Sequence, residues 1–179
     1  LLAEIAVQNN QPSQAISVLE KAVSRNPKDL RCRGYLADLL AHNGRYAEAI
    51  PHFEKELALS HGISRLALDQ LLLTTALAYN NSGEPLKAVD KLKMAIRNNR
   101  QNLEAYYNLA STFQAIGQME QATKYAIQAL EIDPLFSKSL YILSIIDIDF
   151  FNKNLVEMIK EKVSSHTTPV EDKIYFSFT

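Results

Sequence analysis

The stretch Leu103 to Pro134, LEAYYNLASTFQAIGQMEQATKYAIQALEIDP, decides how this chain folds. Leu109 and Phe113 are four residues apart, so both side chains lie on one face of a helix. Gly117 can take the left-handed conformation that ends a helix. The small side chain of Ala122 then lets a second helix approach the first closely. The stretch therefore predicts two antiparallel helices joined by a tight turn.

The same pattern recurs along the chain. The alanine of the second helix stands at positions 15, 49, 88 and 122, so that the steps between copies are 34, 39 and 34 residues. One hairpin cannot bury both of its faces, and we expect the copies to stack. The turn position of each copy holds a residue that tolerates the left-handed conformation: Asn10, Gly44, Gly83 and Gly117.

These steps predict an all-α chain with four hairpins over residues 1–134. The hairpins are 1–29, whose first helix is partial, then 30–63, 64–102 and 103–134. The 39-residue step places five extra residues between Ser60 and Leu68, with Ser64 as a helix cap, and predicts a longer first helix in the third hairpin. Pro51 lies about one turn into a helix, which predicts a local bend or a shortened helix start.

Residues 135–179 fit the pattern poorly and are expected to form degenerate capping helices. We expect one helix over Phe136 to Phe150 and another over Asn154 to Ser164. The last segment, Val170 to Thr179, could begin a further hairpin or form a strand, because its apolar residues alternate. The sequence leaves these two alternatives open.

Composition limits the classes of partner. Charged residues make up 22% of the 179 residues, the net charge is −1 and no basic run is present, so the sequence does not support nucleic-acid binding. No apolar run reaches the ~20 residues that a membrane span needs. Cys32 is the sole cysteine, which rules out a disulfide within the chain and fits a reducing compartment. We therefore expect a cytoplasmic protein without a membrane span.

The residues that could carry chemistry do not form a recognisable site. The four histidines and Cys32 lack the spacing of metal ligands. The chain has no Gly-rich loop for a phosphate or sulfonate donor, and Ser165 and His166 have no orienting acid. We expect no catalytic residues, no cofactor and no metal ion in these 179 residues.

The recurring columns resemble those of the tetratricopeptide repeat family, whose pattern is W-x2-L-G-x2-Y followed by A and P. The residues that carry the resemblance in the fourth hairpin are Tyr106, Leu109, Ala110, Phe113, Gly117, Ala122, Ala129 and Pro134. In the second hairpin, Arg33 and Glu56 replace the apolar and small residues of the pattern. The resemblance implies a right-handed superhelical solenoid whose first helices line a concave groove that receives a peptide or an extended segment of a partner.

We call the side chains expected to line this groove, without serving the hairpin packing, the groove residues: Tyr35, Asp38, Leu73, Leu77, Asn80, Tyr107, Asn108, Ser111 and Tyr141. Tyr107 and Tyr141 are one repeat apart and Leu73 shares their column, which would align three large side chains along the wall. Tyrosine is a favourable anchor because it buries much area at little entropic cost. These rings could equally pack between neighbouring helices, and the sequence does not decide between the two.

The resemblance thus implies a non-catalytic protein-protein interaction scaffold. An alternative is the repeat region of a larger enzyme, because residues 171–178 also resemble the junction at which bacterial repeats of this kind precede a sulfotransferase domain. Self-association through exposed apolar ends is a further possibility, with Leu1, Leu2 and Ile5 at one end and Phe176 and Phe178 at the other. The sequence does not identify the partner.

Overall fold

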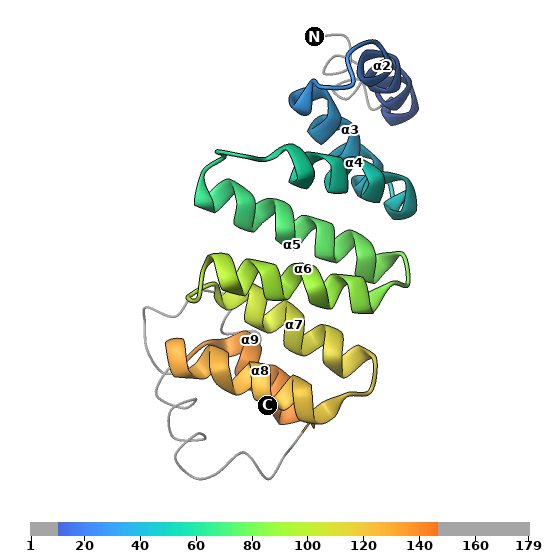
Figure 1. Ribbon diagram of the computed structural model, residues 1–179. Helices are drawn as coiled ribbons and strands as arrows, with labels where there is room; N and C mark the ends of the chain where they lie inside the picture. Colours follow the sequence, from blue (N-terminus) through green and yellow to red (C-terminus); the bar gives the residue numbers. More distant parts are fainter. Residues whose placement is uncertain (1–10, 147–179) are drawn as a thin grey trace, which may run out of the picture. The chain divides into compact units, whose positions relative to one another are not determined.

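The computed structural model describes residues 11–146, and in these residues all regular structure is helical (Figure 1). The helices are α2 (Pro12–Arg25), α3 (Leu30–His42), α4 (Tyr46–Leu59), α5 (Arg65–Asn81), α6 (Pro85–Asn98), α7 (Leu103–Ala115), α8 (Met119–Ile132) and α9 (Ser137–Ile146). They confirm the predicted all-α class. The chain divides into two compact units, Leu1–Lys91 and Leu92–Thr179, and the boundary falls within α6.

Side-chain caps start the first helix of three successive hairpins. The carboxylate of Asp29 accepts a hydrogen bond from the main-chain N–H of Cys32 at 3.1 Å, before α3. The Ser64 hydroxyl and the Asn102 side chain do the same at the starts of α5 and α7, at 3.1 and 3.0 Å. Each cap satisfies an N–H group that has no partner inside the helix.

Glycine ends these same helices. Gly44, Gly83 and Gly117 have φ angles of 74°, 81° and 79°, the left-handed region that only glycine adopts without strain. The predicted turn column is thereby confirmed at these three positions, whereas Asn10 lies outside the described residues. In each turn the chain can reverse within a few residues and start the second helix of the hairpin.

The alanine column lies at the centre of the packing. Ala15, Ala49, Ala88 and Ala122, in α2, α4, α6 and α8, are each 0% exposed. A side chain this small lets a neighbouring helix approach closely, as the sequence predicts. In the second unit, α7, α8 and α9 contribute to one core cluster, which consists of Ala110, Ala126, Ile142 and Leu143.

The additional residues of the 39-residue step between the second and third hairpins lie where the sequence predicts them. Helix α5 has 17 residues, whereas α3 and α7 have 13 each, and it starts after the Ser64 cap. The loop before it contains Gly62, which also has a positive φ, of 88°. The prediction of a longer first helix in the third hairpin is confirmed.

Of the two alternatives predicted for Pro51, the shortened helix start is wrong, and the local bend stays a prediction. Helix α4 begins at Tyr46 and runs for 14 residues with Pro51 inside it. Proline removes the hydrogen bond to the carbonyl four residues earlier, here that of Ala47. Ala47 is exposed, so water can bind the carbonyl that proline leaves free, and the helix continues. Helix α9 covers Ser137–Ile146 of the helix predicted over Phe136 to Phe150, and the predictions for residues 147–179 lie outside the described residues.

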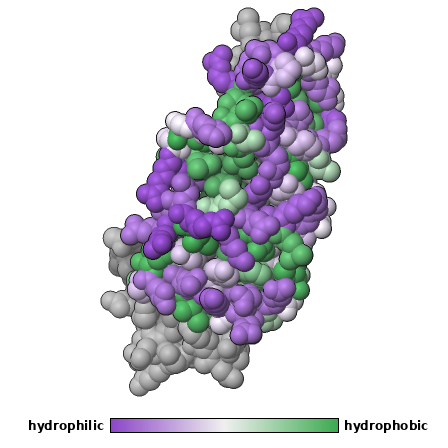
Figure 2. Space-filling view, in the orientation of Figure 1, coloured by the Kyte–Doolittle hydropathy of each residue, from purple (hydrophilic) through white to green (hydrophobic). Residues whose placement is uncertain are grey.

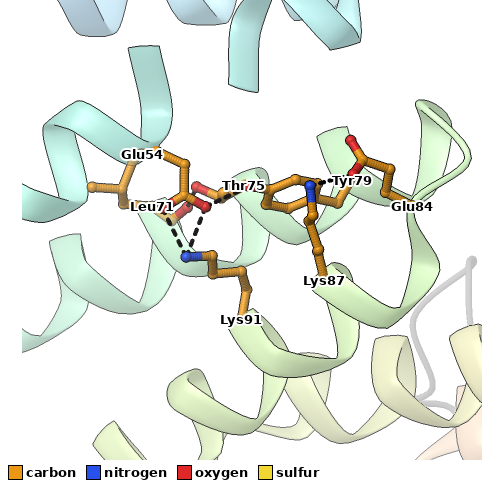
Figure 3. A network of polar contacts seen from close by, with 7 residues as sticks. All are labelled: Glu54, Leu71, Thr75, Tyr79, Glu84, Lys87 and Lys91. Atoms are coloured by element: carbon orange, nitrogen blue, oxygen red, sulfur yellow. Dashed lines mark hydrogen bonds and ion pairs between the residues drawn. The ribbon is translucent and has the colours of Figure 1, made fainter. Parts of the chain in front are cut away.

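Packing in the first unit includes a partly buried polar network centred on Glu54 of α4 (Figure 3). The Tyr79 hydroxyl of α5 donates to Glu54 Oε1 at 2.7 Å. The Lys91 ammonium of α6 lies 2.7 Å from Oε1 and 2.8 Å from Oε2. Lys87 also lies over the Tyr79 ring, 5.4 Å from its centroid, and pairs with Glu84. One carboxylate therefore links three helices of this unit.

Candidate partner-binding surface

The groove residues of the first unit include two large apolar side chains that the fold leaves exposed. Tyr35 of α3 is 62% exposed and Leu77 of α5 is 58% exposed. Asp38 is exposed as well, whereas Leu73 and Asn80 are half-buried. On the face drawn in Figure 2, hydrophobic surface gathers in the upper middle and is bordered by hydrophilic side chains. A contiguous apolar patch bordered by polar residues is typical of an interaction site, whereas single exposed apolar side chains are common on any protein surface.

A glycine and a glutamate meet beside Asp38. Gly34 lies one turn before Asp38 on α3, and a Cβ atom at Gly34 would be 3.2 Å from each carboxylate oxygen of Glu56 of α4. The Glu56 carboxylate thus lies directly against the Gly34 main chain. We call this place, bounded by Gly34, Asp38 and Glu56, the α3–α4 notch.

The two acids of the notch differ in exposure, because Glu56 is half-buried and Asp38 is exposed. Burial raises the pKa of the Asp38 carboxyl above its ordinary value, although His42 acts in the opposite direction. Burial also raises the pKa of Glu56, and repulsion from Asp38 adds to this effect while Arg33 opposes it. Both carboxylates would therefore be more stable beside a cation than they are in the free protein.

The neighbouring Arg33 is directed to other partners. It is 9% exposed, donates from Nη2 to the Pro27 carbonyl at 2.6 Å, and places Nη1 3.4 Å from His52 Nδ1. Its Nε is buried without a hydrogen-bond partner. Burial and the charge of Arg33 both lower the pKa of His52, which favours the neutral imidazole. Arg33 therefore makes no hydrogen bond to the Glu56 carboxylate.

In the second unit, a lysine of α9 lies over a groove tyrosine of α7. The Lys138 ammonium is 5.4 Å from the centroid of the Tyr107 ring, and it forms an ion pair with Glu104 at 2.8 Å. Tyr141 follows Lys138 by three residues and is half-buried, like Asn108 and Ser111 of α7. The first helices of this unit thus present an aromatic and charged surface.

Tyr107 also packs between helices. Its ring lies against the core cluster of Ala110, Ala126, Ile142 and Leu143, and the residue is half-buried. The packing alternative that the sequence left open therefore holds for part of this ring. Lys138 and the notch were not predicted as site features, although Arg33 and Glu56, as departures from the repeat pattern, were the available signal for the notch.

Other kinds of site are not apparent in residues 11–146. No group of three or more histidine, cysteine, aspartate or glutamate side chains in this range could hold a metal ion. No helix in the same range has the length and apolarity to cross a membrane. The thiol of Cys32 is half-buried, and burial raises its pKa, which favours the unreactive neutral form.

Two family models match the sequence, both described as tetratricopeptide repeat, over residues 1–62 and 103–134. A comparison with curated protein sequences finds no match. The resemblance of the tail to repeats that precede sulfotransferases finds no support in these comparisons, and it lies outside the described residues.

Solved structures of repeat proteins share the fold. The crystal structure of MamA superposes with a TM-score of 0.74 at 17% identity, covering 100% of this chain and 98% of that one. YrrB, described as a TPR protein with an unusual peptide-binding site, has a TM-score of 0.67 at 17% identity, with 98% and 87% covered. A MamA fragment from Desulfovibrio magneticus RS-1 has a TM-score of 0.69 at 18% identity, with 89% and 88% covered. The chain shares with them an all-α helical-repeat solenoid fold.

Proposed function

We propose that the chain, which belongs to the tetratricopeptide repeat family and is a protein-interaction scaffold, binds an extended segment of a protein partner along its groove residues. In this proposal the chain catalyses no reaction and serves to hold its partner. The observation that carries the proposal is the exposure of Tyr35 and Leu77, at 62% and 58%, on the first helices of two successive hairpins.

The spacing of the groove residues along successive helices favours a peptide over a small molecule as the ligand. A surface of separate rings, leucines and acids along successive helices suits a ligand that is itself extended, because side chains at several positions can each meet one feature. Helix positions also hold such features rigidly, which reduces the entropy lost on binding. The structural similarity to YrrB, with its peptide-binding site, is consistent with this mode.

The experiment is selection from a library of random linear peptides displayed on phage, followed by affinity measurement for the selected peptides. We expect Tyr35→Ala and Leu77→Ala each to weaken binding about tenfold or more, as loss of an anchor residue does. Leu86→Ala is the matched control, because Leu86 is 65% exposed but lies on α6, a second helix. Selected peptides that respond to Leu86→Ala, but not to the other two changes, would contradict the proposed surface.

The groove residues of the second unit can be tested with the same selected peptides. Tyr107→Ala and Tyr141→Ala together should lower affinity if the peptide extends along α7 and α9. Because Tyr107 also packs against the core cluster, helicity and thermal unfolding of this variant are measured in parallel. Full affinity in a variant that folds normally would restrict the proposed surface to the first unit.

A further inference from the structure

Arg33 of α3 stands in a repeat column whose later copies are uncharged. In the repeat register it corresponds to Leu72, Tyr106 and Leu140, which are 39, 34 and 34 residues further on in turn. Leu72 and Leu140 are each 1% exposed, so the column belongs to the packed interior of the hairpins. Arg33 is itself only 9% exposed, and a charge at such a position is costly unless polar groups bind it.

The guanidinium of Arg33 links helix α4 to residues 26–29, the connection between α2 and α3. Nη2 donates to the Pro27 carbonyl of this connection at 2.6 Å. Nη1 lies 3.4 Å from Nδ1 of His52 on α4, whereas Nε is buried without a hydrogen-bond partner. Among residues 11–146 the guanidinium therefore has two hydrogen-bond acceptors, and one of them is a ring that can be protonated.

Arginine chemistry defines the state of the ring in this contact. A guanidinium has N–H donors and no acceptor, so Nδ1 of His52 can only accept, which requires a neutral imidazole with its proton on Nε2. A separation of 3.4 Å is long for a hydrogen bond, and the attraction is accordingly weak. Protonation would instead place two cations at this distance in a partly buried site, where their repulsion is stronger than in water.

The surroundings of His52 favour the neutral ring. Burial and Arg33 both lower the pKa of the imidazole, and Glu20 of α2 acts in the opposite direction without outweighing them. Glu20 is exposed, so water screens its attraction. Helix α5 also packs against α4, but neither of its charged residues, Arg65 and Asp69, contributes to the shift at His52.

Two acids of α4 lie one turn before and one turn after His52. Glu48 is already bound by Arg45, through two hydrogen bonds of 2.6 and 2.7 Å. Burial raises the pKa of Glu56, and attraction to Arg33 does not reverse this effect. Neither acid contributes to the shift at His52. Protonation of the ring would therefore add a positive charge that these carboxylates do not offset.

We propose that Arg33 and His52 form a pH-sensitive clamp, which holds the α2–α3 connection against α4 while the imidazole is neutral and releases it when the imidazole is protonated. On protonation Nδ1 becomes a donor, so the guanidinium loses one acceptor and faces a second cation. Because α3 packs against both α2 and α4, release of Arg33 should loosen the first hairpin from the second. This inference is independent of the proposed function, since it requires no partner.

The direction of the pH effect follows from the proton uptake of the two states. The pKa of His52 in the folded chain lies below its ordinary value of 6.5, so the unfolded state binds more protons than the folded state between the two values. The stability that the neutral ring contributes is present above 6.5 and is lost as pH falls from 6.5 toward the folded value. Mild acid should therefore weaken the contact between α2 and the second hairpin.

The first test is a pH titration of the wild-type chain, followed by long-range proton–nitrogen correlation NMR of the histidine rings, which reports the tautomer and the protonation of each imidazole. We expect the neutral His52 ring to carry its proton on Nε2 and to be protonated with a midpoint below 6.5. A proton on Nδ1 in the neutral ring, or a midpoint at or above 6.5, would overturn the proposal. This measurement needs no substitution, so it does not depend on how a variant folds.

The second test is amide hydrogen exchange at about pH 7.5 and about pH 5.5, given as protection factors so that the intrinsic pH dependence of exchange cancels. We expect protection in α2 to fall about threefold or more in acid, with a smaller change in α8 of the second unit. His52→Asn puts an amide oxygen close to the position of Nδ1 and removes the titration, so acid should lower protection in this variant less than about twofold. His61→Asn is the matched control, because His61 is exposed in the loop before α5 and its loss should leave the acid response intact.

Three outcomes of the exchange experiment would contradict the clamp. An acid response that persists in His52→Asn would assign it to another group, and a response that His61→Asn abolishes would assign it to the loop before α5. An equal loss of protection in α2 and α8 would indicate a global loss of stability instead of a local release. If the peptide library yields no ligand but the acid response depends on His52, the clamp stands and only the proposed function fails.

Discussion

Two glutamates on α4 should respond in opposite directions to the same substitution. Glu54 accepts hydrogen bonds from Tyr79 and Lys91, whereas Glu56 lies in the α3–α4 notch with no hydrogen bond. Burial would raise the pKa of Glu54, but the bonds from Lys91 and Tyr79 outweigh it and hold the pKa below its ordinary value. Glu54→Gln should therefore destabilise the protein at neutral pH, and Glu56→Gln should stabilise it.

The size of the Glu54 effect follows from its contacts. A hydrogen bond to a charged group contributes about 1.5–3 kcal/mol, but exposed ion pairs contribute only about 0–1 kcal/mol. The side chains of Lys91 and Glu54 are 17% and 35% exposed, which places this pair between the two cases. Glutamine still accepts a bond from Tyr79 but loses the charge, so we expect Glu54→Gln to lower the free energy of unfolding by about 1 kcal/mol.

The assay is urea denaturation followed by circular dichroism, for the wild type, Glu54→Gln, Lys91→Met and the double variant. The double-mutant cycle isolates the interaction between Glu54 and Lys91, and we expect a coupling free energy of about 1 kcal/mol at pH 7. Because the folded pKa of Glu54 is depressed, its contribution is present above the ordinary value of 4.5 and should be lost as pH falls through the folded value. A coupling below about 0.3 kcal/mol, within the usual error of additivity, would refute the reasoning.

Glu56→Gln should change the free energy of unfolding in the opposite direction to Glu54→Gln. The folded pKa of Glu56 is raised above 4.5, so the folded state binds more protons than the unfolded state in the window between the two values. Stability attributable to Glu56 therefore falls as pH rises through this window. Glu56→Gln should raise the urea midpoint at pH 7 and give a smaller gain at pH 4. A loss of stability at pH 7 would show that attraction to Arg33 outweighs burial and the repulsion from Asp38.

Three further predictions concern the helical hairpins. Ala110→Leu should overpack the core of the second unit and cost ~1–3 kcal/mol. Gln128→Leu, at a half-buried position of α8, should change the melting temperature little. Equal shifts in melting temperature for the two variants would mean that the repeat register is wrong. Ser64→Ala should cost about 1 kcal/mol and fray the start of α5, measurable by amide hydrogen exchange. Gly83→Ala should cost ~1–2 kcal/mol through its positive φ alone, because nothing lies within 4 Å of the added Cβ; an unchanged urea midpoint would contradict this.

The sequence predicts those parts of the fold that depend on a small number of strict residue types. A helix crossing accepts little beyond alanine and a left-handed turn little beyond glycine, so Ala49 and Gly83 can be recognised without coordinates. The greater length of α5 follows from the 39-residue spacing between these residue types in the second and third hairpins. A shortened helix start at Pro51 does not occur, because the carbonyl that proline leaves free belongs to an exposed residue; the alternative of a local bend stays a prediction.

The candidate surface is less readable from sequence, because its residues are not constrained by the hairpin packing. Tyr35 and Tyr107 are both groove residues, yet one is 62% exposed and the other packs against the core cluster. Lys138 reaches Tyr107 from another helix, 31 residues along the chain, and no local pattern indicates that contact. Likewise, Glu56 is visible as a departure from the repeat, but its position against Gly34 depends on how α3 and α4 cross.

The Glu54 network makes the hairpins of the first unit different from one another, whereas the repeated alanines make them alike. Alanine columns alone would let a designer exchange, duplicate or delete hairpins freely, because each crossing looks the same. Glu54, Tyr79 and Lys91 break that equivalence, since each lies on a different helix and all three must be present together. A rearranged chain that separates α4 from α5 and α6 would leave a partly buried glutamate and lysine without their ion-pair partners. The contacts between these side chains therefore favour the present order of the three helices.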